Sequence, residues 1–148
     1  MEKTEMIHRL NDLIQLDVDA VEAYEQAIKH IGYKDIAKRF REYQDDHRAH
    51  ITNLTALVQQ MGGTPVKPTP DLKGYLIEGF TALMSLTGAK QALEAMKSNE
   101  KLTNRTYQEA VDQPFPEDVM SVLRTNLSQE QRHLNYIDEI LSIPRREL

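Results

Sequence analysis

The sequence predicts an all-α protein: an antiparallel bundle of four helices, built as two helical hairpins joined by a long crossover. Three observations indicate this class. Apolar residues recur every three or four positions along four long segments, which is the period of an amphipathic helix. The same segments are rich in Ala, Leu, Glu, Lys and Gln, residues with high helix propensity. The six glycines and six prolines lie between or beyond these segments, where they are typical of turns.

The first hairpin covers the N-terminal part of the chain. Its first helix is expected to run from about Thr4, an N-cap residue type, to Ile31, with Gly32 as the stop signal. Its second helix is expected to begin with Asp35 as the N-cap and to end at residues 62–63, which are both glycine. The apolar stripes of these helices are Ile7, Leu10, Leu13, Ile14, Val21, Tyr24 and Ile28 in the first, and Ile36, Phe40, Tyr43, Ile51, Leu54, Val58 and Met61 in the second.

The crossover follows the second helix. Three prolines within residues 64–70 remove backbone donors and fix an extended path, so no helix is expected there. A helical period resumes at Asp71, but its phase breaks near Gly88. We therefore expect residues 72–86 to form an extra short helix or a kinked segment. This apolar segment is expected to cover the bundle or to form the contact of a homodimer.

The second hairpin completes the bundle. Its first helix is expected from about Ala89 to Asp112, followed by a turn at residues 114–116, which contain two prolines. The last helix is expected to start with the acidic residues after this turn and to run to about Ser142, before Pro144. Neither hairpin alone has enough apolar faces to close a core, so residues 1–148 are expected to form a single domain.

Composition excludes several classes of function. The formal net charge is −5, and Lys and Arg form no run, which disfavours nucleic acid and anionic membrane surfaces as partners. The N-terminus lacks the apolar core of a signal peptide, and no apolar run of about eighteen residues occurs, so we expect a cytoplasmic protein without a membrane span. The chain has no cysteine. Any metal must therefore be held by oxygen and imidazole nitrogen.

Six ionisable side chains fall on the apolar faces, where an unpaired charge costs several kcal/mol. Two pairs lie one helical turn apart, which lets both members of a pair reach one point in space. Nearby polar residues are expected to face solvent instead: Glu22, Glu25, Asp45, His8 and His30. The six inward-facing residues are Asp17, His47, His50, Glu100, Glu130 and His133.

The depth of these residues can be compared by counting from the turns. If the first hairpin turns at about residue 33, Asp17 lies sixteen residues before the turn, and residues 47–50 lie fourteen to seventeen after it. If the second hairpin turns at about residue 114, Glu100 lies fourteen residues before it, and residues 130–133 lie sixteen to nineteen after it. All four helices therefore place polar groups at mid-height, as a shared metal ion requires.

Charge balance also favours a metal. Three carboxylates and three neutral imidazoles carry a charge of −3 in the core. Two divalent ions would bring this to +1, which a bridging hydroxide neutralises, and a single divalent ion would leave −1. Oxygen and nitrogen ligands suit iron, manganese or zinc, and three imidazoles favour zinc or mononuclear iron.

The pattern repeats between the two halves of the chain. Asp17 is followed seven residues later by Tyr24, and Glu100 is followed seven residues later by Tyr107; each half then adds a helix with a pair three residues apart. Over nearly the whole chain this arrangement resembles the ferritin-like di-iron carboxylate superfamily, which includes rubrerythrins and bacterioferritins. The resemblance implies a ferritin-like bundle holding two iron ions, with a Glu from each of two helices and Glu-x-x-His from each of the other two. Tyr24, Tyr107 and Asp46 are expected to surround the ligands.

Two residues depart from the family pattern. Asp17 stands where Glu is usual, and His47 stands where a carboxylate bridges the two metals, which an imidazole cannot do in the same manner. Asp46 could compensate by rotating inward, although it lies roughly 90° from the centre of the apolar face.

The resemblance implies a redox function: oxidation of Fe(II) by O₂ or peroxide, as an oxidoreductase that protects the cell from peroxide stress. The absence of cysteine rules out a rubredoxin-type electron-transfer site in this chain. Two alternatives stay open. One is a non-catalytic structural bundle stabilised by zinc or another metal. The other is a metal-free interaction module, in which the six groups form a hydrogen-bonded polar layer.

Overall fold

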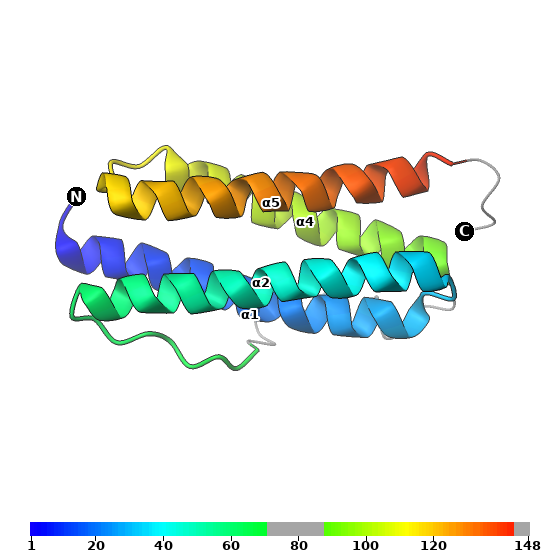
Figure 1. Ribbon diagram of the computed structural model, residues 1–148, viewed down its shortest axis with the longest axis horizontal. Coiled ribbons are helices and arrows are strands. Elements are labelled where there is room, and N and C mark those ends of the chain that lie inside the picture. The colour runs from blue at the N-terminus through cyan, green and yellow to red at the C-terminus, as the bar shows by residue number, and fades with distance from the viewer. Residues whose placement is uncertain (71–87, 144–148) are drawn as a thin grey trace.

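The structure of the chain is a computed structural model that describes residues 1–70 and 88–143. These residues form four long helices: α1 (Lys3–His30), α2 (Lys34–Gln60), α4 (Ala89–Val111) and α5 (Glu117–Leu141). The helices lie side by side in an elongated bundle (Figure 1). The all-α, four-helix class predicted from the sequence is thus confirmed. The extra short helix and the homodimer contact predicted for residues 72–86 fall outside the described residues.

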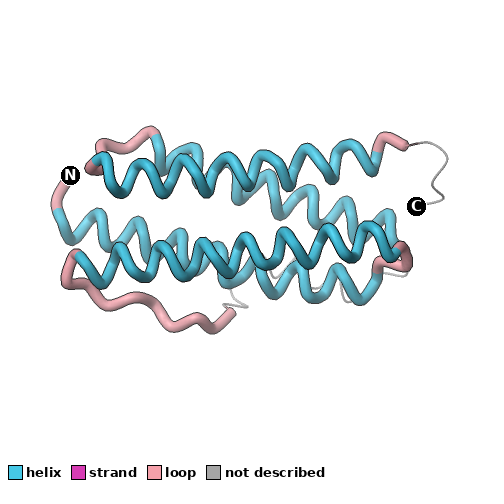
Figure 2. Tube along the Cα trace, in the orientation of Figure 1, coloured by secondary structure: helices cyan, strands magenta, loops and turns pink. Residues whose placement is uncertain are grey.

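Each helix packs against two neighbours that run in the opposite direction. α1 contacts α2 and α4, and α5 contacts the same two helices, so α1 and α5 occupy opposite corners of the bundle. α2 and α4 both begin at the end of the bundle where α1 finishes (Figures 1 and 2). The end of α2 and the start of α4 therefore lie at opposite ends of the bundle, as the predicted crossover requires.

The first residues of the crossover are fastened to α1 by side-chain hydrogen bonds. Asn11 makes two of them: its Nδ2 donates to the carbonyl oxygen of Thr64 at 3.1 Å, and its Oδ1 accepts from the backbone N–H of Val66 at 2.9 Å. Gln15 Nε2 donates to the carbonyl oxygen of Thr69 at 3.1 Å. These contacts satisfy backbone groups that the prolines leave without a helical partner.

The helix ends agree with the sequence to within one or two residues, but two predicted caps are wrong. α1 begins at Lys3, so Thr4 lies inside its first turn, and the N-cap is Glu2, which makes no side-chain capping bond. The N-cap of α2 is Tyr33, and Asp35 lies in the first turn, where its charge still favours the helix dipole. Tertiary packing of long apolar faces, more than capping, stabilises helices of this length. Gly62, with φ of 78°, ends the turn after α2, as predicted.

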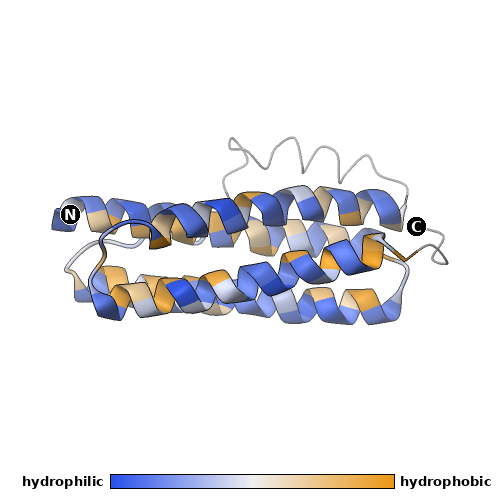
Figure 3. Ribbon diagram, turned by 90° about the horizontal axis from the view of Figure 1, so that it is seen from above, coloured by the Kyte–Doolittle hydropathy of each residue, from blue (hydrophilic) through white to orange (hydrophobic). Residues whose placement is uncertain are grey.

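The apolar faces form two clusters, one toward each end of the bundle, and apolar residues line the facing sides of the helices in Figure 3. The first apolar cluster consists of Leu10, Leu13, Ile14, Val18, Leu54, Leu57, Val58, Tyr107, Ala110, Phe115, Val119, Met120, Leu123 and Leu127. The second consists of Ala23, Tyr24, Ala27, Ile31, Ile36, Ala37, Phe40, Tyr43, Ala92, Leu93, Met96, Ile137 and Ile140.

The buried face of α1 is wider than the predicted stripe. Ile7, Val21 and Ile28 are only half-buried, whereas Val18 and Ala20 are buried. α1 packs against two helices at once, so small residues between the large apolar ones also face a neighbour.

Among the described residues, no helix is both long and apolar enough to cross a membrane.

Candidate metal centre

The structure brings all six predicted side chains together. They lie between the two apolar clusters, at one height, and every one of them is 0 % exposed. All four helices contribute, because each places its residues a similar number of turns from a hairpin loop. The six residues are Asp17 from α1, His47 and His50 from α2, Glu100 from α4, and Glu130 and His133 from α5. We call this set the polar layer.

Four members of the polar layer form a first quartet: Asp17, His47, His50 and Glu130, each with one nitrogen or oxygen atom within 4.8 Å of the others. His47 Nδ1 lies 2.7 Å from Asp17 Oδ1 and 3.3 Å from Glu130 Oε1. His50 Nδ1 lies 3.0 Å from Asp17 Oδ1 and 3.3 Å from Glu130 Oε1. Two imidazole nitrogens and two carboxylate oxygens thus face a common point.

A second quartet overlaps the first: His47, Glu100, Glu130 and His133 satisfy the same 4.8 Å limit. Here His47 uses its other nitrogen, because Nε2 lies 3.2 Å from Glu100 Oε1. His133 Nδ1 lies 3.5 Å from both Glu100 Oε1 and Glu130 Oε2. Glu130 likewise turns Oε1 toward the first quartet and Oε2 toward the second. His47 and Glu130 are therefore common to both.

Two tyrosines, each seven residues after an acid of the polar layer in α1 or α4, make crossed hydrogen bonds. Tyr24 in α1 donates its hydroxyl to Glu100 Oε1 in α4 at 2.6 Å, and Tyr107 in α4 donates to Asp17 Oδ2 in α1 at 2.5 Å. Burial raises the pKa of both tyrosines, and the adjacent carboxylates raise it further. The hydroxyls therefore keep their protons and act as donors to the acids.

The outer nitrogens of two imidazoles also have crossed partners. His133 Nε2 in α5 lies 2.8 Å from Asp46 Oδ2 in α2, and His50 Nε2 in α2 lies 2.6 Å from Gln129 Oε1 in α5. Asp46 has not rotated inward to replace a bridging carboxylate. Its carboxylate lies behind His133, where Arg132 Nη2 also bonds it at 2.9 Å. In the neutral imidazole, an acceptor at Nε2 fixes the proton there, so that the Nδ1 lone pair is available to a metal ion at the centre.

Three contacting residues were missed as site residues from the sequence. Thr103 Oγ1 lies 3.0 Å from Oε2 of both Glu100 and Glu130, and Asn126 Nδ2 donates to the Tyr107 hydroxyl at 3.3 Å. Thr103 and Asn126 are buried polar residues one turn from a predicted acid on the same face, so helical spacing could have found them. Gln129 is only half-buried, and its sequence position gives no such signal.

Burial and hydrogen bonding shift the carboxylates in different directions. Burial raises the pKa of Asp17 and Glu100, but hydrogen bonds from the neighbouring imidazoles outweigh it and hold both pKa values below the usual range. Burial also raises the pKa of Glu130, where the opposing charge of His47 does not compensate and the charge of Glu100 adds to the shift. Two of the three acids are thus held as anions.

The imidazoles are held in their charged form when no metal is bound. Burial lowers the pKa of His50, but the adjacent carboxylates of Asp17 and Glu130 outweigh it and raise the pKa to about 9. Burial likewise lowers the pKa of His133, and the adjacent carboxylates of Asp46, Glu100 and Glu130 outweigh it and raise the pKa to about 10. Protons at these nitrogens occupy the position that a cation would take.

The donor set fits a metal ion. Glu130 Oε1 and His133 Nδ1 are buried, face the centre and have no hydrogen-bond partner, although buried polar atoms are normally paired. A cation coordinated at the centre would satisfy both atoms. Carboxylate oxygens and imidazole nitrogens are ligands that iron, manganese and zinc accept.

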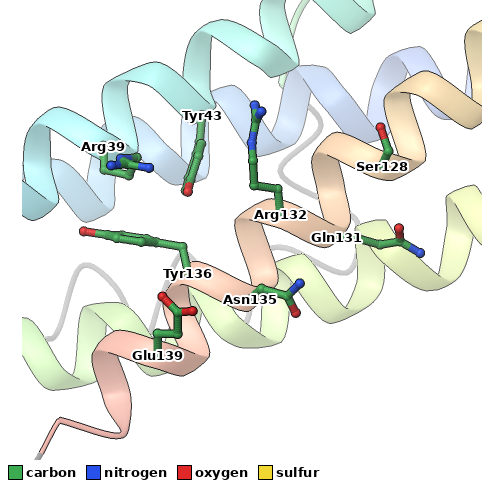
Figure 4. Close-up of a pocket in the computed structure, with 8 residues that line it drawn as sticks. All are labelled: Arg39, Tyr43, Ser128, Gln131, Arg132, Asn135, Tyr136 and Glu139. Carbon is green, nitrogen blue, oxygen red and sulfur yellow. The ribbon is translucent and has the colours of Figure 1, made fainter.

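A surface pocket between α2 and α5 lies outside the polar layer (Figure 4). Its lining is mostly polar: Arg39, Tyr43, Ser128, Gln131, Arg132, Asn135, Tyr136 and Glu139. The ring of Tyr43 separates it from the centre, since the ring centroids of Tyr43 and His133 are 4.2 Å apart. Figure 4 shows Tyr43 between the side chains of Arg39 and Arg132. None of the six polar-layer residues lines this pocket.

The five polar residues that the sequence predicted to face solvent lie outside the polar layer. Glu25 and Asp45 are exposed, and Glu22 and His30 are half-buried. The side chain of His8 is 78 % exposed. Asp17 is the one member of the acids Asp17, Glu22 and Glu25 that is buried, as the helical register predicted.

Comparison with known structures identifies the fold. The bundle is similar to the "ferritin like, diiron-carboxylate proteins" of Bacillus anthracis str. Ames, with a TM-score of 0.75 at 18 % identity over 96 % of this chain and 100 % of that one. It is also similar to a conserved hypothetical protein of Mycobacterium tuberculosis, with a TM-score of 0.79 at 13 % identity over 95 % of this chain and 100 % of that one. The fold is therefore ferritin-like, as the sequence pattern implied.

Comparison by sequence identifies the family. No curated protein matches the chain. A family described as a domain of unknown function (DUF2383) matches residues 5–113, a span that contains α1 from Glu5 onward and all of α2 and α4. Since this match covers well over half of the 148 residues, the chain belongs to the DUF2383 family and has a ferritin-like fold.

Proposed function

We propose that this protein binds two metal ions, iron in the first instance, in the polar layer, and that the bound iron carries out redox chemistry with O₂ or peroxide. The observation that carries this proposal is the pair of overlapping quartets, each with two imidazole nitrogens and two carboxylate oxygens in a fully buried layer. A structural polar layer has no need of two such groups at one height.

Six residues would hold the ions. Asp17 and His50 would serve one ion, Glu100 and His133 the other, and His47 and Glu130 would lie between them. The chemistry available from bound iron is the reduction of peroxide to water with two protons and two electrons, one electron from each Fe(II). The name of the Bacillus anthracis structures, which includes "diiron-carboxylate", supports iron by analogy of fold.

The surrounding residues would prepare this chemistry. Tyr24 and Tyr107 hold two carboxylates in place through crossed hydrogen bonds. Asp46 and Gln129 orient two imidazoles so that Nδ1 faces the centre, which is the usual task of residues behind metal ligands. The apolar clusters on either side exclude bulk water and strengthen the electrostatic interactions within the layer.

A second candidate is a non-catalytic bundle stabilised by zinc. The four nitrogen–oxygen distances of the first quartet are 2.7 to 3.3 Å. Ligands at about 2.0 to 2.2 Å from a tetrahedral zinc would be about 3.3 to 3.6 Å apart, so this quartet would need to open by only a few tenths of an ångström to hold zinc. In that case the metal would add to stability without turnover.

Elemental analysis and an oxidation assay separate these candidates. Protein purified without chelator or nickel resin should contain about two metal ions per chain. Fe(II) added to the metal-free protein in air should be consumed faster than in protein-free buffer. Zinc retention without Fe(II) oxidation above the buffer rate would favour the structural bundle. A metal content well below one ion per chain would overturn both candidates and support the metal-free interaction module.

A further inference from the structure

We infer that His47 bridges the two metal ions as an imidazolate, with Nδ1 bound to one ion and Nε2 to the other. This inference rests on the proposed function and specifies how its two sites are joined. In the ferritin-like di-iron carboxylate pattern that the sequence resembles, a bridging carboxylate stands at this position. The chain would therefore use a different bridge at the same place.

The two ring nitrogens of His47 face different quartets. Nδ1 lies 2.7 Å from Asp17 Oδ1 and 3.3 Å from Glu130 Oε1, on the side of the first quartet. Nε2 lies 3.2 Å from Glu100 Oε1, on the side of the second quartet. Both nitrogens therefore lie against carboxylate oxygens that are candidate metal ligands.

The other two imidazoles are arranged as terminal ligands. His50 turns Nδ1 inward and places Nε2 at 2.6 Å from the amide oxygen of Gln129. His133 turns Nδ1 inward and places Nε2 at 2.8 Å from the carboxylate of Asp46. Each ring has one nitrogen for the centre and one for an outer acceptor. The contrast with His47, whose two nitrogens both face the centre, is the observation that assigns the bridge.

Neighbouring rings hold His47 in this orientation. Its centroid lies 5.5 Å from that of Tyr24, 5.6 Å from that of His50 and 5.1 Å from that of His133. The His47 side chain is 0 % exposed. A ring packed on several sides cannot swing one nitrogen away from the centre without displacing its neighbours.

Charge balance supports the imidazolate form. When both nitrogens bind metal, the remaining N–H bond of His47 breaks, its proton leaves to solvent and a nitrogen–metal bond forms, with no change in oxidation state. Three carboxylates and one imidazolate then carry −4, which two divalent ions neutralise. No additional anion is needed, and a neutral centre is the least costly state in a buried layer.

The bridge predicts the spacing of the ions. Two metal–nitrogen bonds of about 2 Å on opposite sides of an imidazole ring place the ions about 6 Å apart. Carboxylate-bridged pairs in two-metal enzymes are closer, at about 3.5 to 4 Å. The spacing therefore distinguishes the two kinds of bridge without any measurement of turnover.

The direct test is anomalous X-ray scattering from crystals of the full chain loaded with Zn(II). Two anomalous peaks about 6 Å apart, one at each nitrogen of His47, would support the bridge. Two peaks about 3.5 to 4 Å apart, or a single peak, would overturn the bridge and leave metal binding standing. No peak in the layer would overturn the proposed function itself.

Variants at position 47 give an independent measurement in solution. In protein loaded with two equivalents of Cu(II), a shared imidazolate couples the two electron spins, so the EPR signal should integrate to well below two spins per chain. His47→Gln should restore an uncoupled Cu(II) signal, and His47→Glu should give a crystal spacing of about 3.5 to 4 Å. His8→Gln, which alters an exposed imidazole, should leave the coupling unchanged. Uncoupled spins in the parent protein would contradict the bridge even if a variant failed to fold.

Discussion

The Tyr107 hydroxyl in α4 donates to Asp17 Oδ2 in α1 at 2.5 Å. The other oxygen of Asp17 lies 2.7 Å from His47 Nδ1 and 3.0 Å from His50 Nδ1. One carboxylate is thus held from outside the polar layer by a phenol and faces two imidazoles inside it. Glu100, the acid at the related position of α4, is held in the same way by the hydroxyl of Tyr24.

Tyr107→Phe should destabilise the protein and weaken metal binding. The substitution keeps the ring in the first apolar cluster but leaves a buried carboxylate oxygen without its donor, which costs about 1 to 3 kcal/mol. Chemical denaturation of the metal-free and metal-loaded forms would measure the loss. Tyr24→Phe should give a loss of similar size, since Tyr24 makes the equivalent bond to Glu100. A change below about 0.3 kcal/mol in both variants would show that these bonds do not support the layer.

Asp46→Asn should weaken metal binding about 10- to 100-fold, the usual effect of altering a residue behind a metal ligand. The amide carries no charge to favour the Nε2 proton of His133, which Asp46 now accepts at 2.8 Å. Competition with a chelator of known affinity would measure the change. Asp45→Asn is the matched control, because Asp45 is exposed and pairs with Arg48 on the surface. Equal effects of the two substitutions would assign the loss to surface charge.

His133→Ala should reduce the metal content from about two ions per chain to about one or fewer. The variant removes a terminal ligand of the second quartet and leaves Asp17 and His50 of the first in place. Elemental analysis of both proteins, purified in the same way, gives the comparison. Glu22→Ala should leave the content unchanged, because Glu22 lies outside the layer and bonds Gln26 on its own helix. Retention of both ions by His133→Ala would remove this residue from the ligand set.

Metal-free protein should lose stability as the pH rises from about 6.5 to 10. The pKa of His50 is raised to about 9 and that of His133 to about 10, above the unfolded value of about 6.5. The folded state therefore binds more protons in this range, so this stabilisation is fully present below about pH 6.5 and is lost as the pH passes through the folded pKa values. Thermal denaturation at a series of pH values would show it.

The metal-loaded protein provides the control for this pH dependence. A metal ion replaces the protons at the imidazole nitrogens. The melting temperature of the metal-loaded protein should therefore vary less over the same pH range. Parallel curves for the two forms would mean that the metal does not bind at these nitrogens.

Much of the fold could be predicted because it depends on periodicity. The same 3.6-residue period that places Ile137 in the core places Glu130 and His133 there too, and a buried charge stands out in an apolar stripe. Depth could be predicted because antiparallel helices of equal rise bring residues equally far from a turn to one height.

Contacts that depend on side-chain direction could not be predicted in this way. The sequence suggested that Asp46 could turn inward, but its carboxylate lies behind His133, since a residue at the edge of the apolar face reaches the neighbouring helix more easily than the centre. Gln129 is a polar residue, and its sequence position gives no signal of a contact with the polar layer. Its hydrogen bond to His50 becomes evident only from the packing of α5 against α2. The predicted caps at Thr4 and Asp35 are wrong because tertiary packing already stabilises these helices. The N-cap position can then be occupied by residues that make no side-chain capping bond.

The placement of Glu130 in α5, the last of the four described helices, has a consequence for biosynthesis. Both quartets include this residue, and it emerges from the ribosome only after α1, α2 and α4. A nascent chain can display Asp17, His47 and His50 early, yet neither quartet is complete until α5 has been synthesised. Docking of α5 against the other helices is therefore the step that would close the proposed metal centre.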